Sequence, residues 1–161
     1  MIERTLILIK PDGVIRGLMG DVIKRFEQRG LKIIGMKLVN PDKKIADEHY
    51  SDLGERHGEK IKNDMVDYLI SGPNLAVVVE GVDAIANVRK IAGSTFPNEA
   101  SIGTIRGDFA HTSKEYGNKV GRMKNLVHAS SSKQDAENEI KLWFNENEIV
   151  GYKLSYEDQI S

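Results

Sequence analysis

The feature that most constrains the fold is an alternation of short apolar runs with segments in which apolar residues recur every three or four positions. The first run, Thr5–Ile9, is β-branched or apolar throughout and predicts a buried strand. It ends at Lys10-Pro11-Asp12-Gly13, which predicts a tight turn with Lys10 at the strand end. Further strands are expected over residues 31–38, with a bulge at Gly35, over 75–79, and over 125–128.

Helical spacing fills the intervals between these strands. It predicts helices over residues 15–26, within 40–69, over 84–92, and after Ser132, which with Asp135 matches a helix-start capping pattern. The periodicity disappears between Ser94 and Lys124, so we expect a long irregular loop there. The β-α-β-β-α-β order predicts an α+β fold, a ferredoxin-like antiparallel sheet in two layers, with extra helices and this loop.

Composition limits the classes of protein to consider. A chain of 161 residues with 40% hydrophobic and 29% charged residues suits one folded domain, which we expect to span residues 1–161. Its net charge of -1 argues against general binding of nucleic acid or anionic membranes. With no export signal or long apolar segment visible and no cysteine, we expect a cytoplasmic location and no membrane partner.

His128 has the most suggestive surroundings of the four histidines. Small hydroxyl residues and the start of a helix follow it directly, and amide groups at a helix start favour negative charge. A phosphoryl group could therefore rest beside this imidazole. The alternative is a partly buried histidine at the end of a strand, and position alone leaves both open.

Cationic and polar residues in other segments could complete a phosphate site. Arg106 lies between glycines in Gly103–Asp108, where the backbone can approach a ligand and a guanidinium can grip two phosphate oxygens. Lys10, Arg89 and Thr95 come from three further segments. Any one of them alone could equally be a solvated side chain, so the hypothesis depends on the combination.

Five segments together make the chain similar to the nucleoside diphosphate kinase family. In order they are Lys10–Gly13, His49-Tyr50, Ser71–Pro73, Gly103–Phe109 and Asn125–Ser130, and the resemblance extends from Glu3 to about Tyr152. It implies a phosphotransferase that moves the γ-phosphate of a nucleoside triphosphate to a nucleoside diphosphate in a ping-pong reaction.

The resemblance also implies a role for each site residue. His128 would carry the phosphoryl group, with Glu139 orienting its ring and Ser130 nearby. Mg²⁺ would arrive on the nucleotide phosphates, so no dedicated protein metal site is expected. A homo-oligomer, either a hexamer or a tetramer, is implied too. The positions that match nucleotide-binding positions of the family are Lys10, Tyr50, Arg89, Thr95, Arg106 and Asn125.

Three departures from the family pattern bear on the site. Glu55–Glu59 occupies the region where relatives carry a phenylalanine that stacks on the base, and Arg56 or His57 could offer a flat face instead. Ser131 stands where many relatives carry aspartate. The segment from Phe109 to Asn125 is longer than usual and has a surplus of basic residues.

Two other classes of function remain to be compared. The same sheet topology serves RNA recognition, but that class needs exposed aromatic residues on adjacent strands, and the strand-like runs here are aliphatic. A catalytically silent scaffold that kept the fold is the third hypothesis. Retention of every charged and nucleophilic position of the pattern argues against it.

Overall fold

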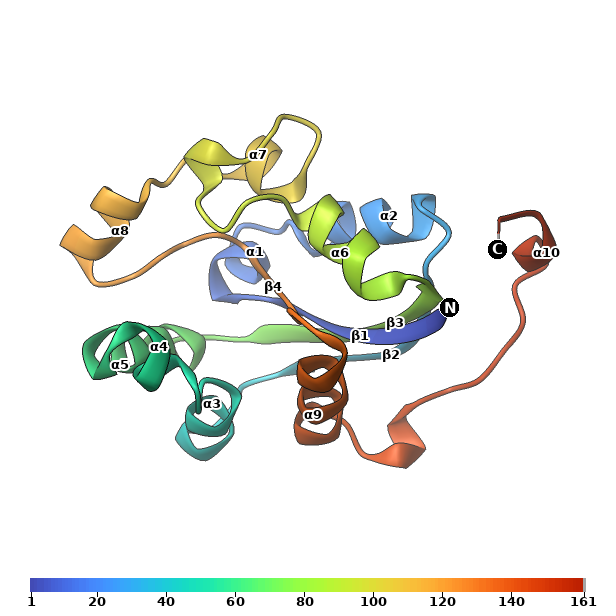
Figure 1. Cartoon of the computed structure of the whole chain (residues 1–161), viewed down its shortest axis with the longest axis horizontal. Helices are drawn as coiled ribbons and strands as arrows, with labels where there is room; N and C mark the ends of the chain where they lie inside the picture. The colour runs from blue at the N-terminus through green and yellow to red at the C-terminus, as the bar shows by residue number, and fades with distance from the viewer. Residues whose placement is uncertain (161) are drawn as a thin grey trace.

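A four-stranded antiparallel sheet in the order β2-β3-β1-β4 forms the centre of the computed structural model (Figure 1). This order confirms the expected ferredoxin-like topology, with β1 and β3 as the inner strands. The structure describes residues 1–160, so Ser161, the last residue of the expected domain, lies outside the described residues. The strands are β1 (Ile2–Ile9), β2 (Lys32–Val39), β3 (Asn74–Val82) and β4 (Val127–Ala129).

Helices cover both faces of the sheet, as Figure 1 shows. The long helices are α2 (Met19–Gln28), α5 (Glu59–Leu69), α6 (Ala84–Ala92) and α9 (Lys133–Trp143). The shorter helical elements are α1 (Pro11–Ile15), α3 (Lys43–His49), α4 (Leu53–His57), η1 (Pro97–Glu99), α7 (Ile105–Phe109), α8 (Lys114–Val120), η2 (Glu146–Glu148) and α10 (Glu157–Ile160).

Strand β1 is buried on both faces, which changes the expected two-layer arrangement. Successive side chains of a strand point to opposite faces. Ile7 and Ile9 pack in a core with residues of α2 and α6, whereas Leu6 and Leu8 pack in a second core with residues of α3, α5 and α9. The expectation of two layers was therefore wrong, because the extra helices cover the sheet face that a minimal ferredoxin-like fold leaves open.

Three local expectations also needed correction. The expected tight turn at Lys10–Gly13 is the start of α1, because Pro11 at the first helical position suits a helix as well as a turn. Residues 94–124 contain η1, α7 and α8, whose three to seven residues are too few to produce visible periodicity. The last strand spans Val127–Ala129 instead of 125–128, while the expected bulge near Gly35 is confirmed.

Pairing between β4 and β1 sets the position of His128. His128 lies directly opposite Leu8 in the antiparallel register, so its side chain lies on the same face as that of Leu8. That face carries α3 and α9. The fold therefore brings a histidine near the end of the chain under two helices that come from distant parts of the sequence.

An unusual backbone conformation precedes β4. Leu126 has φ of 68°, a left-handed conformation that costs a residue with a side chain about 1–2 kcal/mol. Its N–H donates to Asp12 Oδ2 at 3.2 Å, and its carbonyl accepts from Lys10 N–H at 2.8 Å. Asp12 in turn accepts a short hydrogen bond from the Tyr68 hydroxyl. The start of α1 thus holds the bend that leads the chain into β4.

The described residues contain no helix long and apolar enough to cross a membrane. The inner strands also offer no open aromatic surface of the kind that RNA-recognition sheets use, because Leu6 to Ile9 of β1 are completely buried. The faces of the inner strand β1 over these residues therefore form cores.

Gly107 tests how tightly α7 is packed. A Cβ at this position would lie 2.1 Å from the Ser101 carbonyl oxygen, a backbone atom that cannot move alone. We expect Gly107→Ala to lower the free energy of unfolding by about 1–3 kcal/mol, measured by urea unfolding. Gly20→Ala in α2 is the control, since no atom lies within 4 Å of its Cβ and alanine favours helix. Equal stability of the two variants would contradict the packing described here.

Candidate active site

A cleft of roughly 1030 Å³ opens beside His128, between the ends of several elements. Its walls come from the end of β1, from α3 and α4, from the end of α6, from the segment that leads into β4, and from α9. Eight of the residues expected from the sequence line this cleft: Lys10, Tyr50, Arg89, Thr95, Arg106, Asn125, His128 and Glu139. The ninth, Ser130, is fully buried next to Glu139.

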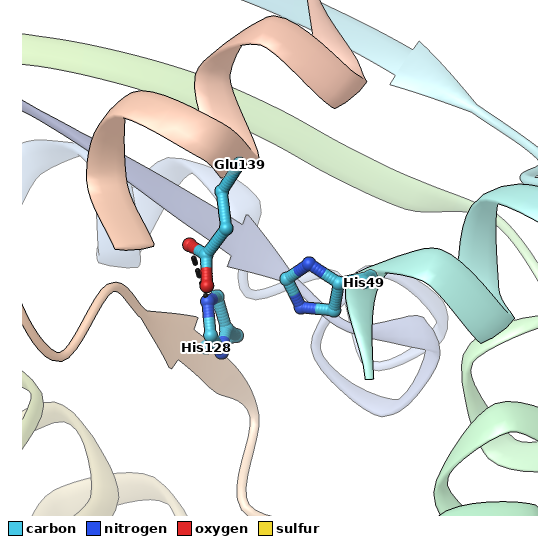
Figure 2. A group of neighbouring side chains, drawn as sticks. All are labelled: His49, His128 and Glu139. Carbon is cyan, nitrogen blue, oxygen red and sulfur yellow. Dashed lines mark hydrogen bonds and ion pairs between the residues drawn. The ribbon is translucent and has the colours of Figure 1, made fainter. Parts of the chain in front are cut away.

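A carboxylate holds the His128 ring in place. His128 Nε2 lies 2.8 Å from Glu139 Oε2, and Ser130 Oγ donates to the same oxygen at 2.6 Å. Figure 2 shows the Glu139 side chain reaching from α9 to His128 on β4. An ionised carboxylate accepts hydrogen bonds only, so His128 Nε2 carries the proton and Nδ1 keeps a free electron pair. The ring is thereby set in the tautomer that a nucleophile needs.

His49 lies against His128, and its Nε2 has no hydrogen-bond partner within residues 1–160. The ring centroids are 4.4 Å apart and the planes meet at 78°. Figure 2 shows the two rings beside each other. Trp143 Nε1 donates to His49 Nδ1 at 3.3 Å, which leaves the proton of the neutral ring on Nε2. Burial, followed by the neighbouring His128 and Lys10, lowers the pKa of His49 well below its ordinary value. His49 is therefore neutral at physiological pH.

Lys10 is a buried cation that contacts a polar amide. Its Nζ donates to Asn125 Oδ1 at 2.5 Å, and Asn125 Nδ2 donates to the Thr95 carbonyl at 2.9 Å. Burial, followed by the nearby Arg106, lowers the pKa of Lys10 to about 7, while Asp12 opposes the shift. A phosphate bound nearby would raise this pKa and restore the charged form of Lys10. The buried lysine therefore favours an anionic ligand.

Arg106 uses its guanidinium to hold backbone as well as to line the cleft. It donates to the carbonyl oxygens of Gly93 and Val127 at 2.7 Å each and to that of Asn125 at 3.2 Å. Because a guanidinium has five N–H groups, these bonds do not exhaust it. Burial, followed by Arg89, lowers the pKa of Arg106 to about 10. The expected grip on phosphate must therefore come from the remaining donors.

Tyr50 and Thr95 complete the expected set. The Tyr50 hydroxyl is buried without a hydrogen-bond partner among the described residues, and burial followed by Glu139 raises its pKa. It therefore stays a neutral donor. Thr95 lies exposed at the cleft, where its carbonyl supports Asn125.

The structure answers two of the departures from the family pattern. Ser131 donates a short hydrogen bond to Asp135, one helical turn further on, so a carboxylate is supplied to this side of the cleft from α9. Arg56 lines the cleft and pairs with Asp52 at 2.9 Å, whereas His57 is exposed and is not among the described residues that line it. Arg56 is thus the flat side chain near the cleft.

Sequence reasoning missed the two residues that support this geometry. His49 was noticed only as part of a motif, although its place beside Tyr50 could have drawn attention to it. Asp12 was noticed only as a turn residue, yet it holds the bend at Leu126. Both roles depend on contacts between segments about 80 or more positions apart, which local patterns do not show.

The fold and the cleft define an anion-binding α+β protein with a histidine prepared for nucleophilic chemistry. The family model described as "Nucleoside diphosphate kinase" matches residues 3–149. A nucleoside diphosphate kinase of Borreliella burgdorferi is 44% identical over 156 residues, which cover 95% of this chain and 93% of the relative. The chain therefore belongs to the nucleoside diphosphate kinase family.

Solved structures of relatives agree with this assignment. The chain matches a transition state mimic of nucleoside-diphosphate kinase from Borrelia burgdorferi, with bound vanadate and ADP, at a TM-score of 0.96 and 43% identity, covering 98% of this chain and 96% of that one. It also matches the Halobacterium salinarum enzyme in complex with CDP at a TM-score of 0.86 and 36% identity, covering 100% and 99%.

The pKa of Lys10 predicts a pH dependence of stability in the nucleotide-free chain. Below pH 7 both the folded and the unfolded state bind the lysine proton, so the whole free-energy cost of burying the charge lowers the stability of the folded state. Between pH 7 and the ordinary value of 10.5 only the unfolded state binds it, so stability rises with pH. Urea unfolding across this window should show wild type gaining stability relative to Lys10→Met. Parallel curves for the two proteins would contradict the shifted pKa.

Proposed function

We propose that this chain is a nucleoside diphosphate kinase that transfers the γ-phosphate of a nucleoside triphosphate to a nucleoside diphosphate through a phosphohistidine at His128. The observation that carries the proposal is the hydrogen bond from His128 Nε2 to Glu139, in a cleft that Lys10, Arg89 and Arg106 make cationic. Family membership and the relatives that hold nucleotides support the same reaction.

The reaction has two balanced steps. In the first, the electron pair of His128 Nδ1 attacks the γ-phosphorus and forms the P–N bond, while the bond from that phosphorus to the β-phosphate oxygen breaks and its electron pair leaves on the nucleoside diphosphate. In the second, a β-phosphate oxygen of another nucleoside diphosphate attacks the same phosphorus and the P–N bond breaks. Glu139 and Ser130 act as positioning residues, since they hold the ring through Nε2 while Nδ1 forms and loses the bond.

The remaining cleft residues stabilise charge on the moving phosphoryl group. Lys10, Arg89 and Arg106 offset negative charge, and the Tyr50 hydroxyl and Asn125 amide offer hydrogen bonds to phosphate or sugar oxygens. Thr95 lies at the same rim. Because Lys10 and Arg106 are already buried and held by fixed hydrogen bonds, they need little rearrangement when a nucleotide enters.

Magnesium reaches this site on the nucleotide phosphates in our proposal. The cluster of metal-ligating side chains found in residues 1–160 is His49, His128 and Glu139, with one carboxylate and two imidazoles. Mg²⁺ prefers oxygen ligands in octahedral geometry, so this donor set does not suit it. When bound, the ion neutralises phosphate charge, and the protein residues bind and orient the complex.

The wider properties follow from the family. We propose a single domain over residues 1–161, a homo-oligomer that is a hexamer or a tetramer, and a cytoplasmic location. Loose selectivity for the base is proposed because the cleft residues assigned to the ligand address phosphate and sugar, while Arg56 offers a flat face without reading base edges. Membrane or nucleic-acid partners are not required for this reaction.

The mechanism predicts a specific covalent label. Incubation with γ-labelled nucleoside triphosphate and Mg²⁺ should leave a phosphoryl group that is labile to acid and stable to base, and adding a nucleoside diphosphate should remove it. His128→Ala should abolish the label and the transfer, because no other group in the proposed path can form the P–N bond. Glu139→Gln should slow labelling by at least about 10-fold through loss of ring positioning. Rapid-quench labelling and transfer from GTP to ADP measure both effects.

Matched histidine variants control for this experiment. His57→Ala and His111→Ala change exposed side chains and should label like wild type. His49→Ala should still be labelled, because His49 does not carry the phosphoryl group. The fold of every variant is checked by circular dichroism. If a folded His128→Ala protein still transferred phosphate normally, the phosphohistidine mechanism would be refuted. The same result would exclude the silent-scaffold hypothesis, because the protein would be catalytically active.

A further inference from the structure

His49 is a buried side chain in the wall of the cleft, and the proposed reaction gives it no role. The residue is only 8% exposed, and its Nε2 has no hydrogen-bond partner within residues 1–160. Its other ring nitrogen, Nδ1, accepts from Trp143 Nε1, so the proton of the neutral ring lies on Nε2. A buried donor in this state is rare in folded proteins and calls for an explanation.

The contact between His49 and His128 offers that explanation. The two ring centroids are 4.4 Å apart in an edge-to-face arrangement. Figure 2 shows an edge of the His49 ring directed at the His128 ring. The edge of an aromatic ring carries partial positive charge and its face partial negative charge, so this contact is attractive. His49 is therefore placed by its contact with His128 and not by the needs of its own Nε2.

The hydrogen bond to Glu139 does not by itself fix the orientation of the His128 ring. It holds Nε2, at the far end of the ring from the Cβ–Cγ bond. Rotation about that bond swings Nδ1 through a wider arc than Nε2, which lies closer to the rotation axis, and this torsion has a broad energy minimum in histidine. A side chain packed against the ring restricts the rotation, and His49 occupies that position.

We propose that His49 is a positioning residue for the transfer, and that its ring holds Nδ1 of His128 in the direction of the incoming γ-phosphorus. This inference rests on the proposed function, because it assumes that Nδ1 is the nucleophile. Glu139 sets the tautomer of His128, and His49 sets the plane of its ring. Displacement of a reacting group by about 1 Å can slow a reaction by about 100-fold, so the plane of the ring matters for the rate.

Trp143 in turn fixes the position of His49. This residue is the single tryptophan of the chain and is buried at the end of α9. Its Nε1 donates to His49 Nδ1 at 3.3 Å, and the two rings meet edge to face with centroids 5.7 Å apart. Glu139 lies one turn earlier on the same helix. Helix α9 thus supports the nucleophile twice, directly through Glu139 and indirectly through Trp143 and His49.

The neutral state of His49 suits this role. A protonated ring would lose the electron pair on Nδ1 that accepts from Trp143, and it would place a second cation near Lys10. Burial, followed by the neighbouring His128 and Lys10, lowers the pKa of His49 well below its ordinary value. The ring therefore acts on His128 through contact and not through charge.

Single-turnover labelling of His128 with γ-labelled nucleoside triphosphate and Mg²⁺ tests the inference on the full chain. His49→Asn keeps an oxygen that can accept from Trp143 but removes the ring. We expect its rate constant at saturating nucleotide to fall by at least about 10-fold, with the half-saturating nucleotide concentration changed by less than about twofold. His49→Phe restores a flat ring and should recover the rate constant to within about threefold of wild type. His111→Asn changes an exposed histidine and should label like wild type.

The time course separates positioning from stability. A variant that folds poorly lowers the fraction of protein that is labelled, whereas misplacement of Nδ1 lowers the rate constant of the protein that does label. Trp143→Phe gives a second measurement, because it leaves the His49 ring without the hydrogen bond that fixes it. Its rate constant should also fall, and the double variant His49→Asn/Trp143→Phe should be no slower than His49→Asn alone, since Trp143 acts through His49.

Several results would overturn the inference. A wild-type rate constant for His49→Asn would show that His128 needs no second support. A change in the half-saturating nucleotide concentration alone would make His49 a nucleotide-binding residue, and equal slowing by His49→Asn and His49→Phe would exclude the ring contact as the cause. Fully additive effects of the Trp143 and His49 variants would break the proposed chain of contacts. Failure of the proposed function would appear separately, as absence of labelling in wild type.

Discussion

The antiparallel pairing of β4 with β1 is the constraint on which the site depends. It places His128 opposite Leu8, on the sheet face that α3 and α9 cover. The left-handed bend at Leu126 makes this pairing possible, and Asp12 and the backbone of Lys10 hold that bend. Because the same residue, Lys10, also contributes its ammonium group to the cleft, the strand pairing and the electrostatics of the site are built by one segment.

Positive charge concentrated in the cleft is the second constraint. Arg106 lowers the pKa of Lys10 and Arg89 lowers that of Arg106, in both cases after burial as the larger cause. Like charges held together in a partly buried site destabilise the empty protein. Their placement is understandable if an anion completes the site, and phosphate groups of a nucleotide supply that anion. Arg106 also holds the backbone on both sides of the bend, which joins stability to binding.

Much of this could be predicted from the sequence, for identifiable reasons. The strand over Thr5–Ile9 and the helix after Ser132 were visible because period and capping are local properties. The turn at Lys10–Gly13 was mistaken because proline and aspartate begin helices as readily as turns. The helices α7 and α8 were missed because five to seven residues do not establish a period. His128 and the cationic residues around it were singled out from their local surroundings, whereas Tyr50, Asn125, Ser130 and Glu139 were added through the family resemblance.

The sequence by itself determined the element order, the aliphatic character of the strands and which nucleophilic, cationic and polar side chains are present. These properties depend on residue type and local periodicity. Only the tertiary structure decided which of them meet. The His128 tautomer follows from Glu139 on α9, and the neutral state of His49 follows from its burial beside Trp143 and His128. Such properties arise from desolvation and from contacts between distant segments, so no local pattern encodes them.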